Sequence, residues 1–409
     1  INIDDAFFEG LGAHVLSRDL AALWQTVLMP TMLPSVPKSL GRLSDVFVSA
    51  LGSITGIDNR LKLPRSNSAC VVLVDGLGSF NLKANAGHAP FLAKQLELNG
   101  STHCGFPSTT AASITSFGTG LSAGSHGIIG YQVQDPESGK VLNLLTGWGA
   151  GIDPQIWQPK KTVNEMANES GVESFVIGPP EYDGSGFSVA SMRGAKYIAA
   201  KSFDDRVAKA QQVLSTKQKS LVYLYFPELD QRAHAFGVDS QNWREKLEDL
   251  DAAIKSLAQG LPKNSGLLLT ADHGVIDVPR DKHIYLDEYN DQLSGLTAVG
   301  GDPRVLFLYF KGLDTAELQI RATQLNVAIG GAVTVLTKEE IIKSGWYGEV
   351  SSEASDRMPE LFMVTIGTWA LYHRDYAKPK SLNMIGQHGS ISAEELTVPL
   401  LRFGAFAQL

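Results

Sequence analysis

The sequence is poor in charged residues and has no excess of basic ones, which excludes several classes of protein. Only 19% of the 409 residues are charged, acidic residues outnumber basic ones by 43 to 35, and the net charge is -8. A negative surface repels a phosphate backbone, so no nucleic-acid polymer is expected as a partner. A phosphorylated substrate would need cations held inside its site, and metal ions are the obvious candidates. The 44% share of apolar residues is typical of a globular protein and argues against disorder.

Cysteines and long apolar runs are also scarce. Cys70 and Cys104 each lie in or beside an apolar stretch, so we expect buried, reduced thiols. No apolar run is long enough to span a bilayer, and the first ten residues lack the basic and apolar regions of a signal peptide. These absences predict a cytoplasmic protein. Because the chain starts at Ile1 rather than at a methionine, an exported form with a trimmed N-terminus stays open.

Short apolar runs alternate with helix-like segments, which predicts an α/β protein with a parallel or mixed sheet. These runs are Cys70–Val74, Phe175–Gly178, Leu221–Phe226 and Leu267–Thr270. Residues 239–258 repeat apolar side chains at three- and four-residue spacing after a cap at Asp239 or Ser240. That spacing predicts an amphipathic helix whose apolar stripe packs in the core.

The length favours one core domain with a substantial insertion. We expect residues 1–67, with an amphipathic segment at Ser39–Leu51, to pack against a main domain of residues 68–409. The insertion is placed within about residues 275–385. Its strand-like runs, Arg304–Phe310 and Leu361–Thr368, predict further core strands combined with a cap-like part.

Polar residues that are common metal ligands follow three of the apolar runs. Asp75 follows CVVLV, Asp230 and His234 follow LVYLYFPEL, and Asp272 and His273 follow GLLLTA. Ligands of open α/β sheets bind at the carboxyl ends of strands, and carboxylates and imidazoles are ligands that Zn²⁺ accepts. Asp230 and His234 share one face if their turn is helical. Each feature alone also fits a plainer role, such as a solvated helix start.

A stretch rich in small and hydroxyl residues, FPSTTAASITSFGTGLSAGSHGIIGY, runs from Phe106 to Tyr131. It predicts a helix that begins after a proline-containing turn. Free N–H groups at a helix N-terminus suit a phosphoryl group and help to ionise a hydroxyl placed there. The alternative is an ordinary Ser or Thr N-cap.

Taken together, these motifs resemble the alkaline phosphatase superfamily, and within it the nucleotide pyrophosphatase/phosphodiesterase-like branch. The resemblance covers about four fifths of the chain and rests on the order of its parts. The matching parts are Asp75 in VVLVDGLG, Thr110 ahead of Thr119-Gly120-Leu121 and Ser125-His126-Gly127, Asp230 with His234, Asp272-His273-Gly274, and His388 in GQHGSISAEELTVPLL.

The resemblance implies a three-layer α/β/α sandwich around a mostly parallel sheet, with a cap-like insertion in an alkaline-phosphatase-like catalytic domain. It also implies two divalent metal ions, Zn²⁺ first and Mn²⁺ as the alternative. One ion would be held by Asp75, Thr110, Asp272 and His273, and the other by Asp230, His234 and His388. The Thr110 hydroxyl would attack phosphorus, and water would then hydrolyse the phosphothreonine.

The resemblance also bears on the nucleophile and the substrate. Thr109 competes with Thr110, and the spacing to Thr119 favours Thr110. A threonine there argues against sulfatases, mutases and alkaline phosphatases proper. Tyr131 stands where the branch has an asparagine that donates to the phosphoryl oxygen, and its phenol could donate instead.

We therefore expect a phosphodiesterase or nucleotide pyrophosphatase that acts on a small phosphate ester, such as a nucleotide. We expect it to be a monomer or a homodimer. A phosphomonoesterase or a phosphonate hydrolase is the alternative within the superfamily. A catalytically silent binding protein is disfavoured, because all seven ligand positions are filled.

Overall fold

The computed structural model describes residues 33–36, 41–149, 151–216 and 218–407. The chain divides into two compact units, residues 1–34 and 35–409, and the fold described here is that of the second unit. The start of the predicted segment Ser39–Leu51 lies outside the described residues. The rest of this segment lies largely in helix α2 (Ser44–Thr55), which ends at Gly56 in a left-handed conformation.

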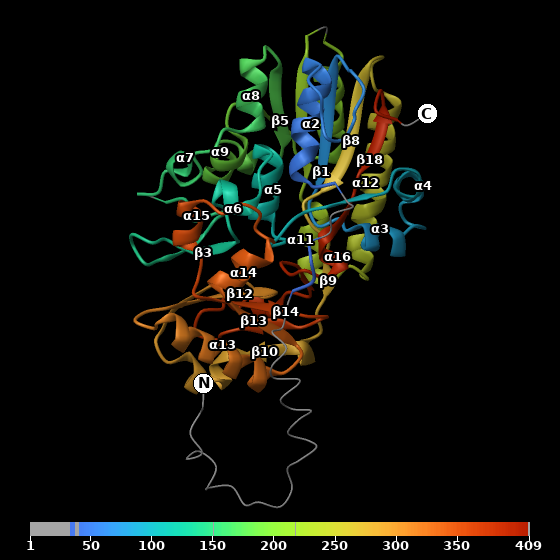
Figure 1. Ribbon diagram of the computed structural model, residues 1–409. Coiled ribbons are helices and arrows are strands. Elements are labelled where there is room, and N and C mark those ends of the chain that lie inside the picture. The colour runs from blue at the N-terminus through green and yellow to red at the C-terminus, as the bar shows by residue number, and fades with distance from the viewer. Residues whose placement is uncertain (1–32, 37–40, 150, 217, 408–409) are drawn as a thin grey trace, which may run out of the picture. The chain divides into compact units, whose positions relative to one another are not determined.

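The centre of the fold is a six-stranded sheet in the order β18-β8-β1-β7-β5-β6 (Figure 1). Neighbouring strands run parallel, except that β18 is antiparallel to β8. All residues of β1 and β8 are buried, as expected for continuous apolar runs covered on both faces. The strands are β1 (Ser68–Val74), β5 (Glu173–Gly178), β6 (Lys196–Ala199), β7 (Ser220–Phe226), β8 (Ser265–Ala271) and β18 (Leu401–Gly404).

Helices pack on both faces of this sheet. On one face α2 packs on β1 and β7 and against α5 (Thr110–Thr119), beside α8 (Val163–Glu169) and α9 (Gly186–Met192). On the other face α10 (Phe203–Leu214) packs on β7 and against α12 (Gln241–Gln259), which contacts α4 (Pro90–Asn99). The predicted α/β/α sandwich with a mostly parallel sheet is confirmed.

Helix α12 forms where the apolar spacing predicted it. The Ser240 side chain caps it by accepting a hydrogen bond from the Trp243 N–H. Its buried stripe is Trp243, Leu247, Leu250, Ile254 and Leu257, among other residues.

The insertion builds a second sheet, in orange tones in Figure 1. Its order is β11-β12-β14-β13, all antiparallel, and its own apolar core includes Leu308, Met363 and Leu325. The elements are β11 (Leu296–Asp302), β12 (Val305–Phe310), α13 (Thr315–Ile329), β13 (Val333–Thr337), α14 (Lys338–Ser344), α15 (Ser352–Arg357) and β14 (Leu361–Thr365).

The prediction that this excursion contributes further core strands is wrong. Within the described residues, no strand between β8 and β18 pairs with the six-stranded sheet. Strands β12 and β14 instead pair with each other, because their apolar side chains pack with helix α13 in the insertion's own core. The second sheet is joined to the chain after α5 by Tyr309, whose hydroxyl accepts a hydrogen bond from Gln134 N–H at 3.1 Å.

Shorter elements complete the fold. They are α3 (Ser79–Ala84), β2 (Ser101–His103), α6 (Ala123–His126), β3 (Gln132–Gln134), β4 (Val141–Asn143), α7 (Pro154–Trp157), α11 (Glu228–Phe236), β9 (Ile276–Asp277), β10 (His283–Tyr285), β15 (Ala370–Tyr372), β16 (Gly386–Gln387), α16 (Ala393–Leu396) and β17 (Thr397–Pro399). Cys70 and Cys104 are buried and free, as predicted. Of the helices in the described residues, none is both long and apolar enough to cross a bilayer.

Candidate active site

The carboxyl ends of three adjacent strands bring the predicted carboxylates together. Strand β1 lies between β7 and β8, so Asp75 at its end has the residues that follow those strands as neighbours. The Asp272 carboxylate accepts hydrogen bonds from the N–H groups of Gly76 at 3.1 Å and His273 at 3.0 Å. Asp230 lies in the first turn of α11, directly after β7.

Thr110 is the first residue of α5, and its hydroxyl oxygen lies 3.1 Å from His273 Nε2. Thr109 occupies the N-cap position, but its side chain makes no capping hydrogen bond. The first N–H groups of a helix have no partner within the helix, so this end of α5 can bind an anion. The ordinary N-cap interpretation therefore does not account for these threonines.

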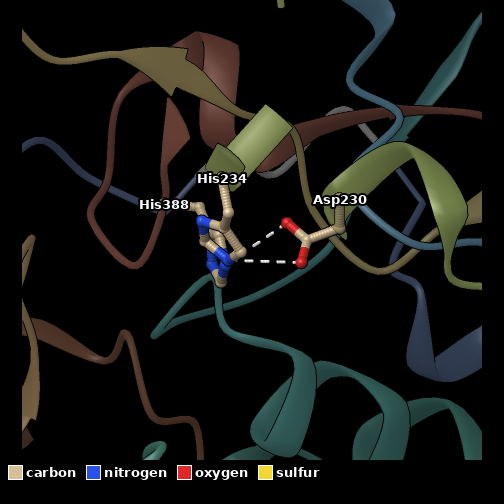
Figure 2. Close-up of side chains that lie close together, drawn as sticks. All are labelled: Asp230, His234 and His388. Carbon is tan, nitrogen blue, oxygen red and sulfur yellow. Dashed lines mark ion pairs between the residues drawn. The ribbon is translucent and has the colours of Figure 1, made fainter. Parts of the chain in front are cut away.

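The six predicted carboxylate and imidazole ligands form two groups. One contains Asp75, Asp272 and His273, and the other contains Asp230, His234 and His388. Within each group the ligand atoms lie within 4.8 Å of one another. Figure 2 shows both imidazoles of the second group facing the Asp230 carboxylate. The groups have the same members as the two ligand sets implied by the resemblance, and Thr110 adjoins the first through His273.

Backbone carbonyls orient the three imidazoles. The Nδ1 atoms of His234, His273 and His388 lie 2.7, 3.2 and 2.9 Å from the carbonyl oxygens of Gly386, Gly274 and Ser108, respectively. A carbonyl can only accept, so Nδ1 carries the proton in each ring. This arrangement, in which the second nitrogen donates to a carbonyl, is typical of metal-ligating histidines.

Three buried carboxylate oxygens in these groups accept no hydrogen bond from the described residues: Asp75 Oδ1, Asp230 Oδ1 and Asp272 Oδ2. Each still lies near an imidazole Nε2. Asp75 Oδ1 and Asp272 Oδ2 are 3.3 and 3.4 Å from His273, and Asp230 Oδ1 is 3.7 Å from His388. Bare lone pairs that face each other in a buried site repel one another unless a cation lies between them. The residues present therefore fit a metal ion in each group.

The pKa directions support the same conclusion. Burial, followed by repulsion from Asp272 and Asp230, raises the pKa of Asp75 well above its usual value. Burial and Asp230 raise the pKa of Asp272 to about 7. Burial lowers the pKa of His273 to about 3, and burial together with His273 lowers that of His388. The group of Asp75, Asp272 and His273 thus disfavours its own negative charge, and a divalent cation bound there would favour the ionised carboxylates.

His234 differs from the other two histidines. Burial acts to lower its pKa, but the Asp230 carboxylate, 3.2 Å from Nε2, raises it to about 9. At neutral pH a proton therefore holds the position between the two side chains that a cation would take. Metal binding at this group would release that proton.

Two cavities meet at Thr110. We call the first, of about 540 Å³, the aromatic cavity, since its lining includes Trp148, Tyr182, Phe187, Tyr197, Tyr223 and Tyr225. No lysine, arginine or histidine of the described residues lines it. The second, of about 420 Å³, is lined by Lys378 and Lys380 of the insertion, and we call it the lysine cavity. Thr110, Leu145, Thr146 and Asp230 line both, and Tyr131 lines the lysine cavity.

Some residues at the site were not predicted from the sequence. The Tyr225 hydroxyl donates a hydrogen bond to Asp75, and Ser108 contacts the loop that carries His388. Asp302, at the end of β11, is buried and interacts with Thr109, and burial raises its pKa to about 7. In the sequence, the Gly-Gly-Asp-Pro segment that contains Asp302 has the composition of an ordinary turn. Tyr225 could have been indicated by its place near the carboxyl end of β7, five residues before Asp230.

Comparison with known proteins identifies the family. Residues 69–391 match the family described as type I phosphodiesterase / nucleotide pyrophosphatase, which is well over half of the 409 residues. The chain therefore belongs to this family, as its motifs indicated.

Individual relatives are distant. The chain is 26% identical over 209 residues to an uncharacterized pyrophosphatase/phosphodiesterase of Schizosaccharomyces pombe, covering 49% of this chain and 41% of the relative. It is 28% identical over 180 residues to human ectonucleotide pyrophosphatase/phosphodiesterase family member 5, covering 42% of this chain and 37% of the relative. These matches span about two fifths of each relative's length.

A solved structure shares the fold. It is murine ectonucleotide pyrophosphatase/phosphodiesterase 5, described as an inactive threonine-to-alanine variant in complex with AMP. The two structures superpose with a TM-score of 0.64 at 23% identity, over 82% of this chain and 88% of the murine chain.

Proposed function

We propose that this chain is a metal-dependent phosphodiesterase and nucleotide pyrophosphatase that uses Thr110 as its nucleophile. The observation that carries the proposal is the place of the Thr110 hydroxyl. It lies at the N-terminus of α5, 3.1 Å from His273 Nε2, where the two cavities meet. A phosphorus atom bound there would have a nucleophile, helix N–H groups and room for two substituents.

The donor set suits two divalent ions. Asp75, Thr110, Asp272 and His273 would hold one, and Asp230, His234 and His388 the other. Such ions would lower the pKa of the threonine hydroxyl and offset the negative charge that develops on the reacting oxygens. Mixed carboxylate and imidazole ligands favour Zn²⁺, with Mn²⁺ as the alternative.

The chain's own residues define the two chemical steps. The Thr110 hydroxyl gives its proton to solvent water and its oxygen attacks phosphorus, and the bond to the leaving oxygen breaks as the Oγ1–phosphorus bond forms. The N–H groups at the start of α5 hold non-bridging oxygens during this step. Water then hydrolyses the phosphothreonine, releases the second product and restores the hydroxyl.

The two cavities favour a diester over a monoester. A diester carries two substituents on phosphorus, and two cavities of ligand size extend from Thr110. The aromatic cavity has no cationic lining residue, so it suits an uncharged planar group such as a nucleobase. The lysine cavity suits an anionic group, as in a phosphoanhydride. The AMP in the related murine structure supports a nucleotide substrate.

The second candidate is a phosphomonoesterase or phosphonate hydrolase. One observation favours it, because Lys378 and Lys380 belong to the insertion and could hold the extra charge of a monoester. The single substituent of the monoester would then lie in the aromatic cavity.

Product analysis separates the two candidates. Protein loaded with Zn²⁺ or Mn²⁺, with its metal content measured on the same sample, is given ATP, AMP and bis-p-nitrophenyl phosphate, and the products are followed by ³¹P NMR. We expect AMP and pyrophosphate from ATP, and hydrolysis of the diester. Inorganic phosphate released from AMP at a higher rate would move the assignment to a monoesterase. A metal-free sample with full turnover would exclude the metal-dependent mechanism.

A further inference from the structure

A third cavity lies beside α5 and shares no lining residue with the two cavities at Thr110. Its volume is about 50 Å³, which suits one small ion or a few waters. Its walls include the start of α2 with the chain just before it, the end of β2, α5, and the loop after α14. We call it the α5 cavity, and its polar lining residues include Arg42, Ser44, His103, Ser113, Ser116 and Ser122.

The lining of the α5 cavity carries a positive charge and no negative one. Arg42 is among the described lining residues, whereas no aspartate or glutamate is. The Asp45 carboxylate accepts from the Arg42 N–H but pairs with Arg60 at 3.0 Å, and the Arg42 guanidinium has no ion-pair partner within the described residues. In a chain with a net charge of -8, this unpaired cation is a local attraction for an anion.

His103 lies directly beside Arg42. The two residues form a parallel β-bridge, in which the His103 N–H donates to the Gly41 carbonyl at 3.0 Å and the Leu43 N–H donates to the His103 carbonyl at 2.8 Å. Burial, followed by the charge of Arg42, lowers the pKa of His103 to about 4. The imidazole is therefore neutral at pH 7 and keeps a single N–H group.

This N–H group has no acceptor. His103 Nδ1 accepts a hydrogen bond from the Gly105 N–H at 3.1 Å, so Nε2 carries the proton. His103 is only 5% exposed, and its Nε2 makes no hydrogen bond with the described part of the chain. A buried donor without an acceptor is costly, so the cavity that His103 lines should hold a group that accepts from it.

We propose that the α5 cavity binds one small anion, of the size of a halide, held by the Arg42 guanidinium and the Nε2–H group of His103. A water molecule would satisfy the imidazole donor but would leave the Arg42 charge without a counter-ion. An anion satisfies both groups at once. It would join the chain before α2 to β2, α5 and the loop after α14, and would therefore stabilise the fold.

The test uses the metal-loaded enzyme with bromide as the probe. Crystals grown in sodium bromide should show a bromine anomalous peak in the α5 cavity, within hydrogen-bond distance of His103 Nε2. In solution, sodium bromide replaces sodium gluconate at constant ionic strength while Tm is measured. We expect Tm to rise with bromide concentration in the way that binding to the folded state alone requires.

Two variants and a control assign the effect to the cavity. Arg42→Gln removes an exposed charge and should raise the apparent Kd for bromide by roughly tenfold or more. His103→Phe keeps a ring against Trp346 but removes the donor, so it should weaken bromide binding as well. Arg280→Gln is the matched control, because Arg280 is also exposed but does not line the cavity. It should show the bromide dependence of wild type.

Anions that bind elsewhere, including at the metal ions, affect wild type and all three variants alike. A cavity that holds only water in the bromide crystals would overturn the proposal. A bromine peak in wild type without a bromide-dependent rise in Tm would mean an adventitious ion only, which also contradicts it. The same bromide dependence in Arg42→Gln and wild type would show that this cavity does not account for the binding.

Discussion

Ser108 offers a direct test of how the proposed nucleophile and the proposed metal ligands are held together. It is fully buried and makes four hydrogen bonds to the segment that begins at His388. Its hydroxyl donates to the Ser390 carbonyl at 2.7 Å and accepts from Gly389 N–H at 3.1 Å. Its own N–H donates to the Gly389 carbonyl at 3.2 Å, and its carbonyl accepts from His388 Nδ1 at 2.9 Å. The residue two places before Thr110 therefore holds a ligand of the second group.

Replacement of Ser108 by alanine removes the two hydroxyl bonds and leaves Gly389 N–H and the Ser390 carbonyl buried. An orphaned buried group costs about 1–3 kcal/mol, so with two such groups we expect the free energy of unfolding to fall by about 2–6 kcal/mol. The Ser108 carbonyl that orients His388 is retained, but the loop that carries His388 is no longer held at a fixed distance from α5. Loss of such an outer contact lowers metal affinity by roughly 10- to 100-fold.

Two measurements check this prediction. Urea unfolding of chelator-treated protein gives the stability, and competition with a metal chelator gives the affinity of the weaker site. Thr115→Ala is the matched control, since Thr115 is a fully buried hydroxyl on the same helix that donates only to the Ala111 carbonyl at 2.7 Å. It should lower stability by about 1 kcal/mol and leave metal affinity unchanged. Equal metal affinity in the Ser108→Ala variant and wild type would show that the contacts stabilise the fold without setting the site.

Three further predictions concern the nucleophile, the lysine cavity and a buried histidine. Thr110→Ala should lower diester turnover by roughly 1,000-fold or more while the protein keeps metal at the Asp230 group, and ICP mass spectrometry with a turnover assay checks both. Joint replacement of Lys378 and Lys380 by alanine should raise the KM for ATP about tenfold. The KM for bis-p-nitrophenyl phosphate should change less than about twofold. Lys343→Ala is the control, because Lys343 lines neither cavity. Burial lowers the pKa of His126 from 6.5 to about 3, so the folded chain keeps this ring neutral, and its contribution to stability is lost as pH falls below about 6.5. Relative to a His126→Gln variant, wild type should lose about 2 kcal/mol between pH 7 and pH 5 in urea unfolding, and parallel curves would contradict this.

The sequence predicts the core of this fold well, because its signals are local. Strands β1, β7 and β8 are short apolar runs, and the ligand-type residues follow them within a few positions. Parallel pairing then brings the ends of these strands together. The ligands that follow these strands therefore come together without any knowledge of distant contacts, whereas His388 was predicted from the resemblance alone. The division between diester and monoester could not be predicted in this way, since the cavities depend on side chains from several segments.

The sequence predicts the insertion less well. Its strands have the same apolar runs as core strands, and local pattern cannot show that β12 pairs with β14 and not with the central sheet. The contact between Tyr225 and Asp75 joins residues 150 positions apart, and the contacts of Ser108 reach across about 280. Neither leaves a periodic signal in the chain.

One buried ion pair connects the insertion to the proposed metal ligands. Arg304, just before β12, pairs with Glu395 at 2.8 Å, and neither side chain is exposed. Glu395 also accepts from Ser390 N–H at 3.0 Å, and Ser390 donates to the Thr365 carbonyl of β14 at 2.7 Å. Removal of one partner of a buried pair leaves the other charge buried without a partner and costs about 3–5 kcal/mol. The insertion that supplies the lysine cavity is thus fixed to the loop of His388. It is therefore not an independent lid, and changes in its packing near Arg304 should affect metal binding as well as substrate preference.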